Sequence, residues 1–286
     1  MSNRSPNPTP SAFWQFCRSH PFTVIAGAIL LVLVLAAVFA PYLGTVDPRK
    51  INLLPRMRAP SAQAWFGSDQ LGRDVWTRTL YGARISLIVG LMVAVMSISL
   101  GLLIGMISGY LRRLDALIMR IMDGLMSIPG ILLAIGLVSV SGASLATVTI
   151  AITIPEIPRV VRLVRAIVLS VREEPYVEAA IAVGTKTPLI LWRHVLPNCV
   201  PPLIVQATYV AASAMLTEAL LSFLGAGTPP EIPSWGNMMA EGRIVFPIAP
   251  WIVLIPGCTL ALAILAVNVL GDGLRDRLDP KIAKRM

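Results

Sequence analysis

The stretch EEPYVEAAIAVGTKTPLILWRHVLPN, residues 173–198, interrupts a chain that otherwise consists of long apolar runs. The chain has 286 residues, of which 56% are hydrophobic and only 14% are charged. So few charges cannot cover the surface of a soluble domain, and lipid must therefore be much of the solvent. The quoted stretch has the composition of a soluble segment, and we expect it to lie outside the membrane.

Proline and glycine divide this stretch into two predicted helices. Two acidic residues precede Pro175, and acids near the N-terminus with proline in the first turn are typical of a helix start. Gly184 can adopt the left-handed conformation that ends a helix. Thr187-Pro188 starts a second helix in the same way, and Pro197 is expected to stop it. The stretch therefore predicts two short helices at an angle, each tied to a membrane span.

A membrane-spanning helix needs about 20 apolar residues. Four runs without Asp, Glu, Lys or Arg are long enough for one crossing each: 21–46, 85–111, 195–217 and 244–271. The run 124–155 is too long for one crossing and too short for two, and the residues SGAS at 141–144 predict a turn within it. Two helices are expected to meet there, each completed by charged flanking residues. The sequence therefore predicts an all-α membrane protein with six transmembrane helices.

An even number of spans places both termini on the same side of the membrane. With the termini in the cytoplasm, 16 of the 24 Lys and Arg residues lie inside or at inner helix ends, and 8 lie outside. Cytoplasmic loops carry an excess of such residues, so this orientation is favoured, although most of the outer eight lie in the segment 47–84. The stretch 173–198 then lies in the longest cytoplasmic connection, between spans four and five.

The residues of this connection follow a recognisable pattern. Its parts are Glu178-Ala179-Ala180, then after three residues Gly184, and then after nine residues His194-Val195-Leu196-Pro197. This spacing resembles the EAA loop of ABC importer permeases, in which isoleucine generally stands at the position of His194. The segment from His194 to Asn198 is similar to the version found in the dipeptide, oligopeptide and nickel branch. Without the resemblance, the same residues describe only an ordinary cytoplasmic helical hairpin.

Further segments are similar to the same branch, in the same order along the chain: 66–75, 221–225, 233–236, 268–276 and 279–280. The resemblance is to the second of two permease subunits, the type with a shorter outer loop after span one. It implies five parts. The first three are a cytoplasmic tail at 1–20, a first transmembrane helix at 21–46 and an extracytoplasmic segment at 47–84. An ABC permease core follows at 85–271, which contains the coupling loop at 168–200, and a cytoplasmic tail ends the chain at 272–286.

The resemblance implies a transport role and no enzymatic one. Together with a second homologous permease, such a chain would form the inward path for di- or oligopeptides in a bacterial inner membrane; nickel complexes and other small solutes remain open as cargo. An extracytoplasmic solute-binding protein would deliver the cargo, and two ABC ATPase subunits or domains would use ATP and Mg²⁺. No cofactor is expected on this chain, because Lys186-Thr187 lacks the glycines at positions 180 and 185 that a phosphate-binding P-loop needs.

The resemblance also implies which residues couple the permease to the ATPase: Glu178, Ala179, Ala180, Ile181, Gly184, His194, Leu196 and Pro197. The two short helices would lie in a groove on the ATPase. When the ATPase domains close on ATP, the helices would be pushed as a rigid lever, which produces alternating access by rigid-body motion.

Small and acidic residues inside the predicted spans indicate two further roles. Ser97, Gly101, Gly105 and Gly109 recur every four residues, a spacing that lets helices approach closely, within the subunit or in the partner permease. Glu218 is the lone acid of span five. We expect it either to line the translocation path or its gate, or to pair with an arginine.

Three basic residues at three-residue intervals, Arg159, Arg162 and Arg165, are interpreted as snorkelling anchors at the cytoplasmic end of span four and not as a voltage sensor. No metal site is expected, because His20 and His194 are the only histidines and the three cysteines are far apart. The net charge of +9 does not indicate a nucleic-acid partner, because the basic residues lie between apolar runs, as in loops beside anionic lipid headgroups.

Two other classes of protein remain open. An ion-coupled secondary transporter would carry intramembrane charges and broken helices, often in two related halves. Glu218 and the prolines of span four fit that class, but no clear internal repeat is visible. A membrane scaffold or assembly factor without a transport role is the second alternative, and the stretch 173–198 excludes it only through the family resemblance.

Overall fold

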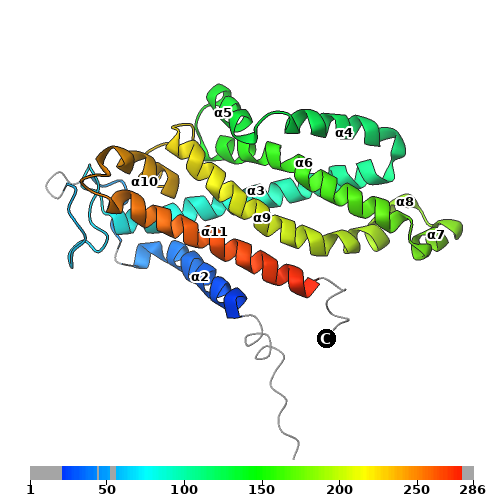
Figure 1. Cartoon of the computed structure of the whole chain (residues 1–286), viewed down its shortest axis with the longest axis horizontal. Coiled ribbons are helices and arrows are strands. Elements are labelled where there is room, and N and C mark those ends of the chain that lie inside the picture. The colour runs from blue at the N-terminus through cyan, green and yellow to red at the C-terminus, as the bar shows by residue number, and fades with distance from the viewer. Residues whose placement is uncertain (1–20, 44, 52–55, 279–286) are drawn as a thin grey trace, which may run out of the picture.

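Long helices run side by side along one axis of the protein, as Figure 1 shows. The computed structural model describes residues 21–43, 45–51 and 56–278, and the predicted tail at 1–20 and the last part of the tail at 272–286 lie outside the described residues. The long helices are α2 (Pro21–Val38), α3 (Val75–Tyr110), α6 (Leu145–Arg172), α9 (Leu196–Phe223) and α11 (Trp251–Leu278). Within the described ranges no β-strand is formed, which confirms the prediction of an all-α protein for this part of the chain.

Helix α2 and the shorter helices lie at the edges and ends of this bundle (Figure 1). Helix α2 lies at one edge, and α4 (Arg112–Met126) and α5 (Gly130–Ser141) lie at the opposite edge. At one end of the long helices lies α10 (Trp235–Gly242), and we call this the α10 end. From the other end project α7 (Pro175–Ala182) and α8 (Thr187–Ile190), and we call this the α7 end.

Among the described residues, four helical stretches are long and apolar enough to cross a membrane: α2, α3, the stretch Thr187–Phe223 that contains α9, and α11. Helices α4 and α5 reach this standard only as a pair, and they are bent by 85° at a break that contains Pro129. Helix α6 is 28 residues long but carries Glu156 and four arginines. The described chain thus has four apolar spans, or five with the bent pair, and the remaining predicted span corresponds to α6.

Several long helices differ from their predicted bounds. Helix α2 ends at Val38 and is followed by a short 3-10 helix, η1 (Ala40–Tyr42), so the run 21–46 is not one helix. Helix α3 begins at Val75, ten residues before the apolar run, because the Asp74 carboxylate caps it and accepts a hydrogen bond from the N–H of Thr77 at 2.9 Å. Helix α11 continues into the predicted tail. Hydrophobicity marks the part of a helix that lipid surrounds, whereas capping groups determine where the helix ends.

The turn predicted at 141–144 is present. Helix α5 ends at Ser141, Gly142 has a φ of +84°, and α6 begins at Leu145. The Ser144 hydroxyl caps α6, since it accepts a hydrogen bond from the N–H of Thr147 at 3.0 Å. The two helices therefore meet where the sequence predicted.

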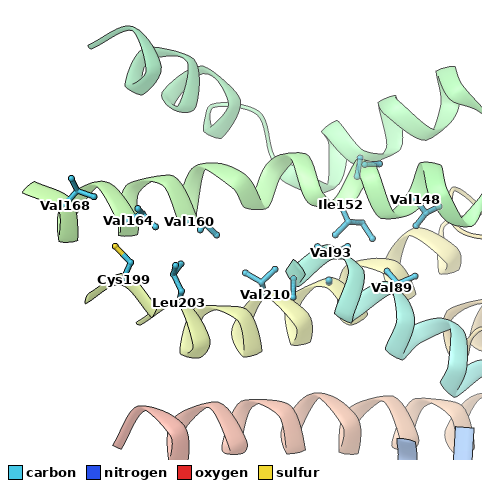
Figure 2. Close-up of a cluster of buried hydrophobic side chains, with 14 of the residues drawn as sticks. Val89, Val93, Val148, Ile152, Val160, Val164, Val168, Cys199, Leu203 and Val210 are labelled. Carbon is cyan, nitrogen blue, oxygen red and sulfur yellow. The ribbon is translucent and has the colours of Figure 1, made fainter. Parts of the chain in front are cut away.

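Helix α6 packs closely against α3. A Cβ atom added at Gly101, Gly105 or Gly109 of α3 would lie 2.5, 2.7 and 2.6 Å from the Cβ atoms of Val160, Val164 and Val168, respectively. Ser97 is buried in the same row, and its hydroxyl donates to the carbonyl oxygen of Val93 in its own helix at 2.7 Å. This row of small residues thus contacts another helix of the same chain, and Figure 2 shows side chains of α3, α6 and α9 meeting in the resulting core.

Candidate functional site

The segment that joins α6 to α9 is fixed to the bundle by buried apolar side chains. Val177 of α7 and Ile190 of α8 are almost fully buried. They belong to the same core cluster as Val168 of α6 and Cys199 of α9. Because the anchors come from both short helices, the segment is held to α6 and α9 along its length.

A polar contact closes the same segment on itself. Nδ2 of Asn198 donates to the carbonyl oxygen of His194 at 2.6 Å and to the hydroxyl oxygen of Tyr176 at 3.3 Å. The rings of Tyr176 and His194 have their centroids 5.8 Å apart. Helix α7 is thereby tied to the first turn of α9, which leaves the segment little freedom to move independently of the long helices.

The prediction that Pro197 stops the second short helix is wrong. Helix α8 continues into a π-helix, η2 (Leu191–Val195), which leads into α9 without a break. The N–H of Leu196 donates to the carbonyl oxygen of Leu191, five residues earlier. Pro197 is the second residue of α9 and directly follows this π-helix, so the chain remains helical through the proline. The connection is therefore mechanically continuous with α9.

Large apolar side chains cover the outward side of this segment. Val183 is 85% exposed and Trp192 is 71% exposed, and Ile181 and Leu189 are each about half exposed. The exposed carboxylate of Glu178 lies in the first turn of α7. Exposed apolar side chains gathered on a segment that is otherwise rigidly held indicate a docking surface for another protein. We call this the coupling surface and define it by these five residues.

The structure distributes the predicted coupling residues over two environments. The exposed ones are Glu178, Ala179, Ile181, Gly184 and Pro197, and the half-buried ones are Ala180, His194 and Leu196. Gly184 has a φ of +83°, which confirms the predicted left-handed end of the first short helix. Sequence reasoning missed Val183, Leu189 and Trp192, whose only signal is apolar character in a segment expected to be surrounded by water.

Glu218 is enclosed by side chains of its own chain and is 0% exposed. The Ser222 hydroxyl donates to its Oε1 at 2.9 Å and the Ser86 hydroxyl to its Oε2 at 3.4 Å. The expected alternative, an ion pair with an arginine, is not formed within the described part of the chain. Serine hydroxyls from α3 and α9 bind this carboxyl group instead.

The three arginines interpreted as snorkelling anchors are each paired with an acid. Nη1 of Arg159 lies 3.2 Å from Oε1 of Glu156 on the same helix. The other two reach α4: Nη2 of Arg162 lies 2.6 Å from Asp123 Oδ1, and Nε of Arg165 lies 2.5 Å from Asp115 Oδ1. Sequence spacing alone could not show the last two pairs, because the partners are far apart in the chain. Both ion pairs hold α4 beside α6.

The exposed side chains of α2 and α6 differ in polarity. Every exposed side chain of α2 is apolar, as Phe22 and Val32 illustrate, and such a surface suits lipid. By contrast, α6 exposes Arg159 and Arg162, and α9 exposes Tyr209. Charged side chains within a membrane face protein or water and not lipid. Helix α6 thus exposes charged side chains, whereas α2 exposes none.

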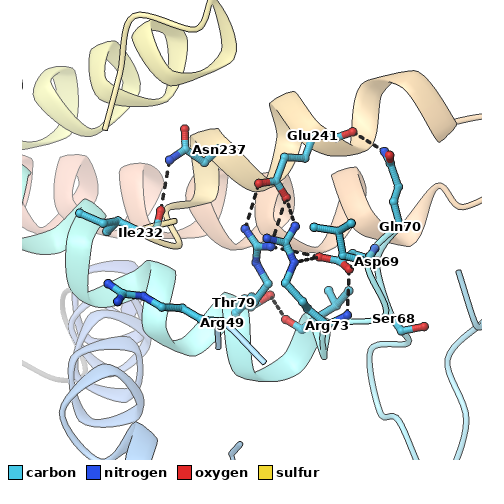
Figure 3. Close-up of polar contacts among 12 residues, drawn as sticks. Arg49, Ser68, Asp69, Gln70, Arg73, Thr79, Ile232, Asn237 and Glu241 are labelled. Carbon is cyan, nitrogen blue, oxygen red and sulfur yellow. Dashed lines mark hydrogen bonds and ion pairs between the residues drawn. The ribbon is translucent and has the colours of Figure 1, made fainter. Parts of the chain in front are cut away.

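An ionic cluster locks the α10 end, as Figure 3 shows. Oδ2 of Asp69 lies 2.6 Å from Nε of Arg73 and 3.0 Å from Nη1 of Arg78. Both arginines also pair with Glu241 of α10, Arg78 through Nη1 at 3.1 Å from Oε2. Nε2 of Gln70 donates to the backbone oxygen of Glu241 at 2.6 Å. The sequence drew attention to 66–75 only as a family segment, and the structure shows that it binds α3 to α10.

Burial raises the pKa of Glu241 to about 7. The nearby Arg73 guanidinium opposes this rise, and the Asp69 carboxylate adds to it. Glu241 lies outside the four apolar spans. The charge of the cluster therefore changes near neutral pH.

Asn237 fixes the proline-rich loop that follows α9. Its Nδ2 lies within hydrogen-bond distance of three backbone oxygens, at 3.0 Å from Thr228, 3.1 Å from Pro229 and 3.1 Å from Ile232. Figure 3 shows the contact with Ile232. This loop is consequently held in one conformation at the α10 end.

No group of three or more His, Cys, Asp or Glu side chains is placed to hold a metal ion in the described ranges. Cys199 is buried in α9 and Cys258 is exposed in α11. Cys17 and His20 lie outside the described residues.

Comparison with known proteins gives the family. Residues 97–284 match the family described as "Binding-protein-dependent transport system inner membrane component", and residues 10–60 match the "N-terminal TM domain of oligopeptide transport permease C". A probable peptide ABC transporter permease of Sinorhizobium fredii is 54% identical over 95% of this chain and 93% of its own length. The dipeptide transport system permease DppC of Alkalihalophilus pseudofirmus is 43% identical over 96% of this chain and 91% of its own length.

A solved structure has the same fold. It is an inward-facing form of the MetNI methionine ABC transporter, in which one chain matches with a TM-score of 0.58 at 18% identity, over 71% of this chain and 96% of that one. This likeness concerns the arrangement of helices only. Together with the family match, it shows that the chain belongs to the inner-membrane components of binding-protein-dependent transport systems, the permeases of ABC importers.

Proposed function

We propose that this chain is one of two permeases of an ATP-driven importer whose cargo is a di- or oligopeptide. The relatives that carry peptide and dipeptide transport in their names support this class of cargo, because they align with nearly the whole chain. A second, homologous permease completes the path through the bacterial inner membrane. A solute-binding protein delivers the cargo from the outer side.

The chain crosses the membrane six times with both termini in the cytoplasm. Helix α6 is the span that apolar composition does not reveal, and pairing of Arg159, Arg162 and Arg165 with acids of the same chain makes its charges compatible with a span. In this orientation the α7 end is cytoplasmic and the α10 end faces the solute-binding protein. The excess of Lys and Arg on the termini side supports this orientation, and the rigid loop around Asn237 suits contact with a receptor.

The coupling surface carries the proposal. It is apolar, exposed and held rigidly between α6 and α9, so a push on it moves both helices and not merely a loop. Partner ATPase domains bind this surface, and they alone use ATP and Mg²⁺. Their closure on ATP displaces the segment as a rigid body, which changes the arrangement of α6 and α9 and with it the side to which the path is open.

Cysteine crosslinking tests this proposal. All three native cysteines are first replaced, and Ile181→Cys is combined with single cysteines in the groove of the ATPase that co-purifies with the chain. We expect a crosslink whose yield changes between nucleotide-free and ATP-bound states. Val140→Cys provides the matched control, because Val140 is also an exposed apolar residue but lies at the end of α5, away from the coupling surface.

A folded, co-expressed pair that gives no crosslink from position 181 would contradict the coupling assignment. Peptide uptake that continues with an ATPase unable to hydrolyse ATP would contradict ATP-driven transport and favour an ion-coupled transporter.

A further inference from the structure

Arg159 lies in the middle of α6. Helix α6 runs from Leu145 to Arg172, which places Arg159 14 residues after its first residue and 13 before its last. The adjacent Val160 packs against Gly101 of α3, near the centre of the charge-free run 85–111. In the six-span arrangement, Arg159 is therefore close to the middle of the membrane and not at the cytoplasmic end of the span, as the sequence had suggested.

The guanidinium group of Arg159 has N–H donors that its contacts with Glu156 leave unused. Its contacts with Glu156 both use Nη1, at 3.2 and 3.3 Å from the two carboxylate oxygens. Among the described residues no contact uses its Nε or Nη2, and its side chain is 51% exposed. A guanidinium with unused donors is costly against lipid at this depth, so it faces the water-filled path or the partner permease.

The neighbouring arginines of α6 differ from Arg159 because each binds an acid of another helix. Arg165 uses two nitrogens to bind Asp115 of α4, at 2.5 and 2.6 Å. Nη2 of Arg162 is paired with Asp123, also of α4, at 2.6 Å. Their aspartate partners hold α4 beside α6, whereas Arg159 pairs with Glu156 of its own helix.

A tyrosine lies at the same level on the neighbouring helix. The hydroxyl of Ser213 donates to Oε1 of Glu156 at 3.3 Å, which fixes the register of α9 against α6. The two helices run in opposite directions, because the segment 173–195 connects them at the α7 end. One helical turn from this contact toward the α7 end are Arg159 on α6 and Tyr209 on α9. Residues three or four apart share a helix face, so both side chains lie on the faces at which α6 and α9 meet, and Tyr209 is 58% exposed.

We propose that Arg159 and Tyr209 form a site that binds the C-terminal carboxylate of a peptide during its passage, with Glu156 as the resting partner of the guanidinium. This proposal rests on the proposed function, since it specifies what the permease recognises in its cargo. A guanidinium binds a planar carboxylate through two parallel hydrogen bonds, and the tyrosine hydroxyl adds a third donor. Glu156 satisfies Arg159 when the path is empty and competes with the cargo, which keeps binding weak enough for release.

The test compares short alanine peptides that carry a free C-terminal carboxylate with the same peptides carrying a C-terminal amide. Uptake of both is measured in cells in which the chromosomal copy of this chain is replaced by a variant. Because receptor and ATPases are the same in every strain, their own preferences cancel when the acid-to-amide uptake ratio of a variant is divided by that of the wild type. Immunoblots of membranes confirm equal amounts of each variant.

Arg159→Gln is expected to lower the acid-to-amide ratio by about tenfold or more, the size of effect expected for a lost charge-assisted hydrogen bond. Arg159→Lys retains the charge and is expected to lose less, and Tyr209→Phe is expected to shift the ratio in the same direction. Arg162→Gln is the matched control: it removes an equally charged and half-exposed arginine from the same helix, and the ratio is expected to stay at the wild-type value.

A wild-type ratio in both Arg159→Gln and Tyr209→Phe, with uptake intact, would overturn the site. If Arg159 served only to neutralise Glu156, the double variant Glu156→Gln, Arg159→Gln would regain the wild-type ratio, and that result would overturn the site as well. No ATP-dependent uptake of any of the peptides by the wild-type strain would overturn the proposed function together with this proposal, whereas an unchanged ratio overturns this proposal alone.

Discussion

Nη1 of Arg78 lies 3.0 Å from Oδ2 of Asp69, and the Arg78 side chain is only 2% exposed. The pair connects the first turn of α3 with the loop that precedes it. Since Arg78 also contacts Glu241, the same guanidinium joins α10 to both. Two arginines and two acids thus form a compact group that determines how three segments fit together at the α10 end.

Asp69→Asn is expected to destabilise the protein by about 3–5 kcal/mol, because two largely buried arginines would then share the single carboxylate of Glu241. Thermal unfolding of the detergent-purified protein measures the loss. Asp47→Asn is the control, since Asp47 is an exposed acid of the same segment whose side chain accepts a hydrogen bond from the backbone N–H of Arg49. Equal unfolding temperatures for the two variants would show that the ionic cluster contributes nothing.

The stability of the α10 end is expected to fall as pH rises toward 7. The pKa of Glu241 is raised in the folded protein to about 7 from an ordinary value of 4.5. A group whose pKa is higher in the folded state stabilises that state while it is protonated, and this contribution is lost as pH rises through the folded-state pKa. Unfolding temperatures measured between pH 5 and 8 should therefore decrease.

Glu241→Gln removes the titrating group and should flatten this dependence. A wild-type slope that persists in Glu241→Gln would assign the dependence to another group.

Gly105→Ala is expected to destabilise the contact between α3 and α6 by about 1–3 kcal/mol, the usual cost of overpacking a tight core. The added methyl group would lie 2.7 Å from Cβ of Val164 and 2.9 Å from the carbonyl oxygen of Val161. Gly136→Ala of α5 is the matched control, because nothing lies within 4 Å of an added Cβ there. Thermal unfolding of both variants should separate them, and a loss as small as that of the control would argue against close packing at Gly105.

Glu178→Lys is expected to abolish peptide uptake while the protein still inserts into the membrane. The carboxylate lies in the first turn of α7, where a negative charge is favourable and a positive one is not, and the substitution reverses the charge of the coupling surface. Uptake assays and membrane immunoblots provide the two readouts. Glu173→Lys, which changes an exposed acid just before α7, is expected to keep most of its uptake.

Gly184→Pro is expected to have the same uncoupling effect for a different reason. Proline requires a φ near −65°, and Gly184 has a φ of +83°. The turn between α7 and α8 must therefore change its course, and the coupling surface with it. Normal uptake by both Glu178→Lys and Gly184→Pro would show that this segment does not transmit force from an ATPase.

Local signals predicted much of the helical framework and of the coupling segment. The left-handed Gly184, the start of α7 at Pro175 and the turn before α6 are present as expected, because each depends on the chemistry of a few adjacent residues. The predicted stop at Pro197 was wrong because the prediction considered the proline alone, whereas the π-helix before it keeps the chain helical from α8 into α9.

Amino-acid composition and order by themselves determined that the chain is a helical membrane protein, where most of its spans lie and which family it belongs to. Only the tertiary structure decided which side chains meet. Glycines of α3 contact valines of α6, and Arg78 contacts both Asp69 and Glu241. The physical reason is the distance along the chain between the interacting residues. Spans, caps and turns depend on residues that are close in sequence, whereas packing and ion pairs depend on segments that become neighbours only after the helices have assembled.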